Sequence, residues 1–183
     1  MNISRAALWL AALTCYSQAS ADEIRLVKKA MIYPSNVMIS SLLNSHDFSI
    51  LTTAIKSVHL EQPLLKPGSY TLFAPDNEAF ARLPERVSSR VFLHINRDEM
   101  AKLLACHLVI NPPQAGKRLL DSVAEGRQLQ LQTLGGCVLT VTKVKNQLSI
   151  TDQSGQTAQI TSADVVQSNG MMEMIDRVLL PAD

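Results

Sequence analysis

From Gln128 onward the chain alternates apolar and polar residues with a period of two. This is the pattern of β-strands that bury one face and expose the other. Short polar turns separate the runs at Gly135-Gly136, at Lys145-Asn146 and at residues 152–155. The pattern therefore predicts an antiparallel meander with one wet face, and its predicted strands are 128–134, 137–144, 147–151 and 156–161.

A further strand pair is predicted near the C-terminus. Ser168-Asn169-Gly170 is a turn sequence, and it lies between two apolar runs, 163–167 and 171–181. The second run is long enough for a central strand. We expect that strand to end at Pro181, because proline cannot donate to a β-ladder.

The first half of the chain has helical spacing instead. Apolar residues recur three and four positions apart between residues 37 and 58, and residues 44–47 predict a break between two short helices. Another helix is expected after Asn96, which can form a capping box with Glu99. Its apolar face would hold Met100, Leu103, Leu104 and His107. Loops are predicted at 61–69 and 111–116. Helices followed by strands indicate an α+β domain and not repeated βαβ units.

The stretch YTLFAPDNEAFARLP, residues 70–84, joins a predicted strand to a predicted helix. Residues 70–74 read as a buried strand that Pro75 stops, since proline has no N–H to donate. Asp76 is placed to cap the following helix, and the negative charge of Glu78 interacts favourably with the dipole at the start of that helix. The alternative is a catalytic carboxylate pair. Side chains two positions apart at a helix start point away from each other, which favours capping.

The first 21 residues have the pattern of a secretory signal. Arg5 supplies a positive charge, residues 6–13 are apolar, and Ala19-Ser20-Ala21 is a small-x-small cleavage site. A membrane anchor would need about 20 apolar residues, and lipidation at Cys15 would follow the unfavourable Thr14. We expect cleavage after Ala21, an N-terminal segment over residues 22–30, and a secreted or periplasmic protein.

The mature chain is expected to carry no net charge. Removing Arg5 from the 17 basic residues leaves 16, against 16 acidic residues, and the basic ones are scattered. Nucleic-acid binding normally requires a basic stripe, and anionic lipid attracts basic clusters. We therefore expect neither nucleic-acid binding nor strong membrane binding.

Two cysteines, Cys106 and Cys137, remain after signal removal. In an oxidising compartment they can pair, whereas as core residues they can also be two separately buried thiols. Sequence spacing does not decide between these alternatives, because pairing depends on the distance in space.

Local signatures of catalysis are absent from the sequence, which contains no G-x-S-x-G, S-x-x-K, H-E-x-x-H, C-x-x-C or nucleotide-binding glycine pattern. No two of the four histidines lie three to five residues apart, so no metal or other cofactor is expected. His46 is interpreted as a surface or capping residue and His107 as a hydrogen-bonded core residue. A dispersed Ser-His-Asp site stays open, because triads assemble in space.

The chain resembles the fasciclin-like domain family. Residues 70–84 look like its first box, Thr-x-Phe-Ala-Pro-(Thr/Ser/Asp)-Asn-x-Ala-Phe, and LLACHLV, residues 103–109, resembles its middle Tyr-His element. SNGMMEMIDRVLLP, residues 168–181, resembles its second box, Asn-Gly-Val-Ile-His-Val-Ile-Asp. The resemblance spans residues 31–181, with the three boxes in order.

This resemblance implies a twisted antiparallel β-wedge or sandwich with several helices packed on it, and no enzyme activity. It also implies that the motif residues mainly hold the fold together; they are Phe73, Pro75, Asp76, Asn77, Phe80, His107, Asn169, Gly170 and Asp176. Two departures are Cys106, where the family commonly has Tyr, and Glu173, where it often has His. No Arg-Gly-Asp is present, so integrin recognition does not carry over.

Two functions follow as hypotheses. The first is a secreted, non-enzymatic adhesion or interaction module that binds a protein, surface or matrix partner and can self-associate weakly. The second is a carrier or sensor of a small apolar ligand, suggested by the flexible thioethers of Met171, Met172 and Met174. A hydrolase with a dispersed site is a lesser alternative.

Overall fold

The computed structural model describes residues 37–89, 97–112 and 117–182. All of them belong to one compact unit, Tyr33–Asp183. The predicted signal peptide, the 22–30 segment, the predicted cap Asn96 and residues 113–116 lie outside the described residues.

Helices dominate the first half of this unit, as predicted. The break at residues 44–47 separates α2 from α3, and the short 3₁₀ helix η1 begins inside it and runs to Phe48. Three short helices were missed: α4 lies inside the predicted loop 61–69, α6 follows Pro84, and α8 precedes the meander. The helices are α2 (Met38–Leu43), η1 (His46–Phe48), α3 (Ser49–Ser57), α4 (Glu61–Leu64), α5 (Asn77–Ala81), α6 (Glu85–Ser88), α7 (Arg97–Ala105) and α8 (Leu119–Ser122).

The strands form one 7-stranded sheet in the order β2-β1-β7-β6-β5-β4-β3. The predicted meander is confirmed: β3 to β6 pair antiparallel in sequence order, and their buried residues alternate. The strands are β1 (Tyr70–Pro75), β2 (Leu108–Ile110), β3 (Gln128–Gln132), β4 (Val138–Val144), β5 (Gln147–Thr151), β6 (Thr157–Gln167) and β7 (Gly170–Ile175).

Four details of the strands differ from the predictions. The separately predicted strands 156–161 and 163–167 form one strand, β6. β1 and β7 pair parallel, so the sheet is not wholly antiparallel. β2 follows α7 directly, where the helical spacing gave no sign of a strand. β7 ends at Ile175 and not at Pro181, because Asp176 exchanges hydrogen bonds with Gln159 and the chain then leaves the ladder.

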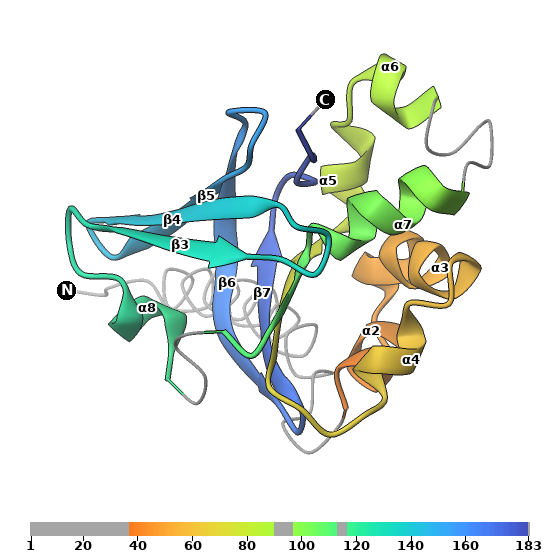
Figure 1. Ribbon diagram of the computed structural model, residues 1–183, viewed down its shortest axis with the longest axis horizontal. Helices are drawn as coiled ribbons and strands as arrows, with labels where there is room; N and C mark the ends of the chain where they lie inside the picture. Colours follow the sequence, from red (N-terminus) through yellow and green to blue (C-terminus); the bar gives the residue numbers. More distant parts are fainter. Residues whose placement is uncertain (1–36, 90–96, 113–116, 183) are drawn as a thin grey trace, which may run out of the picture. The chain divides into compact units, whose positions relative to one another are not determined.

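Strand β6 is the longest, with 11 residues, and it serves two parts of the sheet. Its first residues pair with β5, and from Ile160 it pairs with β7 through an irregular stretch. Figure 1 shows β6 crossing behind the β3–β5 hairpins to run beside β7. Such irregularities bend and twist a strand, so β6 can turn the sheet back toward its own far edge.

The two edge strands of the sheet are brought together at the β3–β4 loop. The N–H of Leu134 donates to the carbonyl of Leu108 in β2 at 2.7 Å, and the N–H of Gly135 donates to Ala105 at 2.9 Å. The sheet therefore nearly closes into a barrel, which leaves few free strand edges. Its interior is mostly apolar and holds Phe73, Val109, Leu119, Val123, Leu131, Leu139, Val141, Leu148, Ile150, Ala158, Ile160, Ile175 and Leu179.

The helices divide between two sides of this sheet (Figure 1). α2 contacts β7 and α5 contacts β1, while α3 packs on α2, α5 and α7. α8 instead contacts β6 and places Leu119 in the barrel interior. The motif residues lie where these layers meet.

Candidate functional site

The first motif forms the junction between β1 and α5. Asp76 caps α5, since its Oδ1 accepts from the N–H of Ala79 at 2.6 Å. Phe73 and Phe80 are buried on the two sides of the junction, as is Pro75 at the strand end. Glu78 is exposed and pairs with Arg82 at 3.1 Å. The two carboxylates therefore have separate local partners, and the capping prediction for Asp76 is confirmed.

Asn77 fastens this junction to the helical layer. Its Oδ1 accepts from the N–H of Ile50 at 3.1 Å, and its Nδ2 donates to the carbonyl of His46 at 2.8 Å and to the hydroxyl of Ser49 at 3.0 Å. An amide supplies both a donor and an acceptor, which a carboxylate does not. The exposed His46 takes part through its backbone only.

We expect Asp76→Ala to lower the free energy of unfolding by about 1 kcal/mol, because the N–H of Ala79 loses its acceptor. Chemical denaturation monitored by circular dichroism measures this change. Asp76→Asn is the matched control, since asparagine caps about as well as aspartate. If both variants lose the same free energy of unfolding, the lost cap does not explain the destabilisation.

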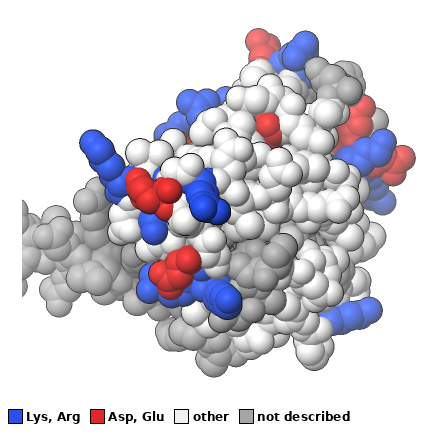
Figure 2. Space-filling view, turned by 60° about the vertical axis from the view of Figure 1, so that its left-hand side comes forward, with Lys and Arg blue, Asp and Glu red and all other residues white. Residues whose placement is uncertain are grey.

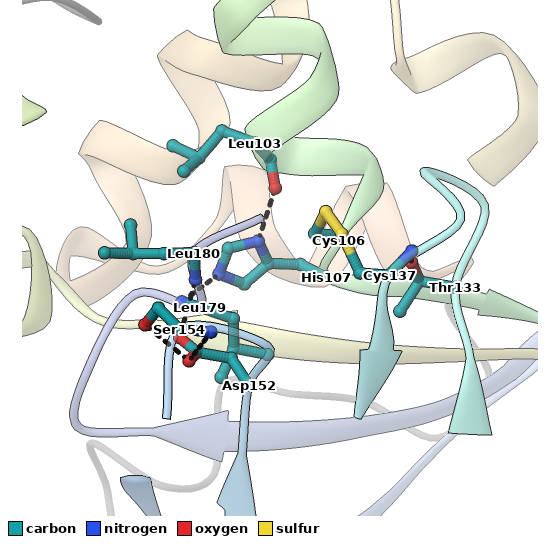
Figure 3. Close-up of a disulfide and its surroundings, with 9 residues drawn as sticks. All are labelled: Leu103, Cys106, His107, Thr133, Cys137, Asp152, Ser154, Leu179 and Leu180. Carbon is teal, nitrogen blue, oxygen red and sulfur yellow. Dashed lines mark hydrogen bonds between the residues drawn. A yellow bond between two sulfur atoms is a disulfide. The ribbon is translucent and has the colours of Figure 1, made fainter. Parts of the chain in front are cut away.

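His107 follows α7 and is buried, with 1% of its surface exposed. Nδ1 lies 2.8 Å from the carbonyl of Leu103, and Nε2 accepts from the N–H of Leu179 at 2.9 Å (Figure 3). A carbonyl only accepts and a backbone N–H only donates, so the ring is neutral with its proton on Nδ1. Both nitrogens are occupied, which leaves neither for a metal or a substrate.

Burial lowers the pKa of His107 from 6.5 to about 4, against the Leu103 carbonyl and the Asp152 carboxylate, which raise it. Asp152 itself binds the C-terminal segment. Its Oδ2 accepts from the N–H of Leu180 at 2.8 Å, and its Oδ1 accepts from the N–H and the hydroxyl of Ser154 (Figure 3). The same Oδ1 also accepts from the N–H of Gln156. His107 and Asp152 together tie residues 179–180 to the barrel.

The lowered pKa of His107 makes a pH prediction. The unfolded chain takes up this proton near pH 6.5, whereas the folded chain does so near pH 4, so acidification through this range favours unfolding. We expect the stability advantage of the wild type over His107→Gln to shrink by up to about 1.4 kcal/mol per pH unit as pH falls from 6.5 toward 4, about 3 kcal/mol in all. Denaturant unfolding of both proteins across this range measures the difference. A constant difference would contradict it.

Cys106 and Cys137 are joined by a disulfide in the structure, with their Cα atoms 5.4 Å apart (Figure 3). That distance lies in the ordinary range for a disulfide. Both residues are buried. The bond connects the start of β2 to the start of β4, beside the hydrogen bonds that bring the sheet edges together. The disulfide and these hydrogen bonds therefore hold the same junction.

The second motif connects the helices to the centre of the sheet. The side chain of Asn169 is buried; its Oδ1 accepts from the N–H of Met38 at 2.9 Å and its Nδ2 donates to the carbonyl of Leu64 at 2.6 Å. Gly170 lies opposite Tyr70 in the neighbouring strand. A Cβ atom at position 170 would lie 2.0 Å from the carbonyl oxygen of Tyr70. Asp176 Oδ1 accepts from the N–H of Gln159 at 2.7 Å.

Sequence reasoning missed one group, which is centred on Glu173 in β7. This side chain is fully buried, and its Oε2 accepts from the N–H of Asp164 at 2.8 Å. Burial raises the pKa of Glu173 to about 8; the Asp164 N–H lowers it and the Asp164 carboxylate raises it. The sequence showed Glu173 only as a departure from the resembled second box and as an acid inside the apolar run 171–175, on the strand face that Ile175 shares.

The surface has no single-sign region in the view of Figure 2, where Lys and Arg side chains lie among Asp and Glu side chains. Among the described residues, no group of three or more His, Cys, Asp or Glu could hold a metal ion. Exposed large apolar side chains in the same part of the chain are Leu43, Ile50, Leu65, Ile110, Leu134, Val138, Val144 and Val166.

The structure therefore defines a helix-covered, nearly closed β-module whose motif side chains form internal links. The Fasciclin domain model matches residues 46–181, and the chain belongs to this family. Within residues 37–89, 97–112 and 117–182, no helix is long and apolar enough to span a membrane.

Relatives of different sizes share this domain. Protein sll1483 of Synechocystis sp. is 30% identical over 175 residues, which cover 96% of this chain and 90% of that protein. Transforming growth factor-beta-induced protein ig-h3 of Sus scrofa is 31% identical, over 81% of this chain but 20% of its own length. A solved domain pair from the insect cell adhesion molecule fasciclin I has a TM-score of 0.47 and 20% identity, covering 69% of this chain and 40% of that one.

Proposed function

We propose that this protein is a secreted or periplasmic, non-enzymatic interaction module that binds a protein, cell-surface, matrix or envelope partner. The observation that carries the proposal is the use of the family's motif residues. Asp76, Asn77, His107, Asn169 and Asp176 each use at least one side-chain polar atom in a hydrogen bond inside the fold. The motif residues therefore stabilise the fold, and we expect other residues, on the surface, to recognise the partner.

The exposed apolar side chains are the first candidates for contact residues, because partner binding is concentrated in side chains that become desolvated. Six of these eight residues fall in two groups, whereas Val144 and Val166 lie in β4 and β6. Leu43, Ile50 and Leu65 belong to the helical layer, whereas Ile110, Leu134 and Val138 lie where the β3–β4 loop meets β2. A contact through either group would bury a different face of the module.

A bait experiment tests this function. Mature protein, residues 22–183, is immobilised and cross-linked to extracellular and envelope fractions of its host. The wild type is compared with Leu65→Glu, Leu134→Glu and the exposed turn variant Gln153→Glu. We expect a partner that the wild type and Gln153→Glu retain and that one of the leucine variants loses. Equal recovery by all four baits, or by an unrelated bait, would contradict the proposal.

Several weak contacts add up to firm binding only when more than one binding domain takes part. We therefore also propose that this protein associates weakly with copies of itself. Sedimentation velocity over a range of concentrations measures it. A concentration-independent monomer would remove this part of the proposal and leave partner binding untouched.

The carrier hypothesis has a separate test. Met172 is fully buried and Met171 and Met174 are half-buried in β7, positions that strand packing explains. Native mass spectrometry of protein isolated from its host would show a bound apolar molecule if the protein is a carrier. Turnover in an esterase and peptidase screen would instead favour a hydrolase.

A further inference from the structure

The short helix α8 is fastened to the barrel by charged side chains from two strands. The carboxylate of Asp164 in β6 accepts from the N–H groups of Leu119 and Leu120. From β4, Lys143 Nζ donates to the carbonyl of Leu120 at 3.0 Å. A helix of four residues has little stability of its own, so these bonds and the burial of Leu119 hold it in place.

Asp164 depends in turn on Glu173. Asp164 lies in the irregular part of β6 and has a left-handed backbone, with φ of 59°, which costs energy for a residue with a Cβ atom. The bond from its N–H to Glu173 Oε2 holds this conformation. Glu173 therefore supports α8 indirectly, through its hydrogen bond to Asp164.

Glu173 lacks a compensating charge of its own. Among the described residues its Oε1 has no hydrogen-bond partner. The nearby cations have other contacts: Arg118 pairs with Asp164 at 3.4 Å and with Asp121 at 4.0 Å, and Lys143 binds the Leu120 carbonyl. From β1 the residue opposite Glu173 is the apolar Phe73. An ionised Glu173 would thus face the Asp164 carboxylate in a site without water to solvate it.

We propose that Glu173 is a proton-operated latch for α8, which keeps residues 118–123 on the barrel while its carboxyl is protonated and releases them when it ionises. Opening of α8 lets water reach the carboxylate, so the open state holds the proton less tightly than the closed state. Opening therefore becomes more favourable as pH rises from the ordinary glutamate range, and the effect levels off near the folded pKa of about 8.

Hydrogen exchange read by mass spectrometry tests the latch, using the full mature chain at pH 6, 7, 8 and 9 with rates corrected for intrinsic exchange. In the wild type, we expect the opening constant of the peptide that covers 118–123 to rise by up to about tenfold per pH unit to pH 8 and then level off. Glu173→Gln should remove this rise. Strand β1, which lies between β2 and β7, should stay protected, because opening is local.

Two other variants separate the latch from a general loss of stability. Asp121→Asn removes an exposed charge from α8 itself and should leave the pH response unchanged. Asp164→Asn keeps the N–H that binds Glu173 but removes the neighbouring carboxylate, which raises the pKa of Glu173. With the opening constant normalised at pH 6 to allow for the weaker cap, we expect this variant to level off at a lower pH than the wild type and to rise less by pH 8. An equal rise in β1, an unchanged rise in Glu173→Gln, or no rise in the wild type would each overturn the proposal.

Discussion

Gly170→Ala is expected to lower the free energy of unfolding by at least about 4 kcal/mol, the range reached when a substitution forces backbone apart. A Cβ atom at this position would lie 2.0 Å from the carbonyl oxygen of Tyr70 and 2.8 Å from its carbonyl carbon and its backbone nitrogen. All three are backbone atoms of β1, which cannot move aside as a side chain can. The φ of Gly170, 149°, is also one that residues with a Cβ atom rarely adopt. The variant must therefore separate β1 from β7, two strands that are paired on both sides.

A matched control isolates the clash from the backbone conformation. Gly136 also has a positive φ, 79°, but a Cβ atom there would meet nothing within 4 Å. We expect Gly136→Ala to cost only about 1 kcal/mol, which is the conformational term alone. Soluble yield and denaturant unfolding of both variants measure the difference. Equal stability of the two variants would show that β1 and β7 do not approach so closely.

Reduction of the Cys106–Cys137 disulfide is expected to lower the free energy of unfolding by about 3 to 4 kcal/mol, the loop-entropy value for cysteines 31 residues apart. The bond restricts the unfolded chain, and in the folded state it joins β2 to the β3–β4 hairpin where the sheet nearly closes. The hydrogen bonds from Leu134 and Gly135 stay available after reduction. We therefore expect a folded but less stable protein.

Unfolding in denaturant with and without reductant measures this effect. The double variant Cys106→Ala with Cys137→Ala is the control, because its stability should not respond to reductant. Alkylation of the unfolded, unreduced mature protein should label neither cysteine. Two labelled thiols would show that the residues are separately buried and not paired.

Much of the fold could be predicted from local patterns. Strict alternation located β3, β4 and β5, and the turn at Lys145-Asn146 has the two positive φ values, 48° and 67°, that a tight hairpin requires. Cap chemistry located the start of α5 at Asp76. These features were accessible because their causes lie within a few residues of one another.

The errors have a common origin. β2 is three residues long and follows a helix, so no period could reveal it. β7 stops at Ile175 because Gln159, His107 and Asp152 bind the chain that follows. The parallel pairing of β1 with β7 joins segments about 100 residues apart in sequence, and loop closure over such lengths leaves no local mark.

The residues of the candidate site also divide into those that local patterns predict and those whose partners are remote in sequence. Motif positions such as Asp76, Asn169 and Gly170 could be named from the sequence, and His107 could be placed on an inward face. The partners of Asn77 and Asn169, by contrast, lie 27 to 131 residues away. The role of Glu173 depends on Asp164, whose bonds to the start of α8 cross 44 and 45 residues.

The sequence by itself determined the α+β class, the meander, the N-cap of α5 and membership of a recognisable family, because hydrophobic period, turn chemistry and motif order are local or linear properties. Only the tertiary structure decided the near-closure of the sheet, the cysteine pairing and the burial of Glu173 beside a second carboxylate. These depend on distances and on the loss of water between segments remote in sequence, and both arise only when the chain packs.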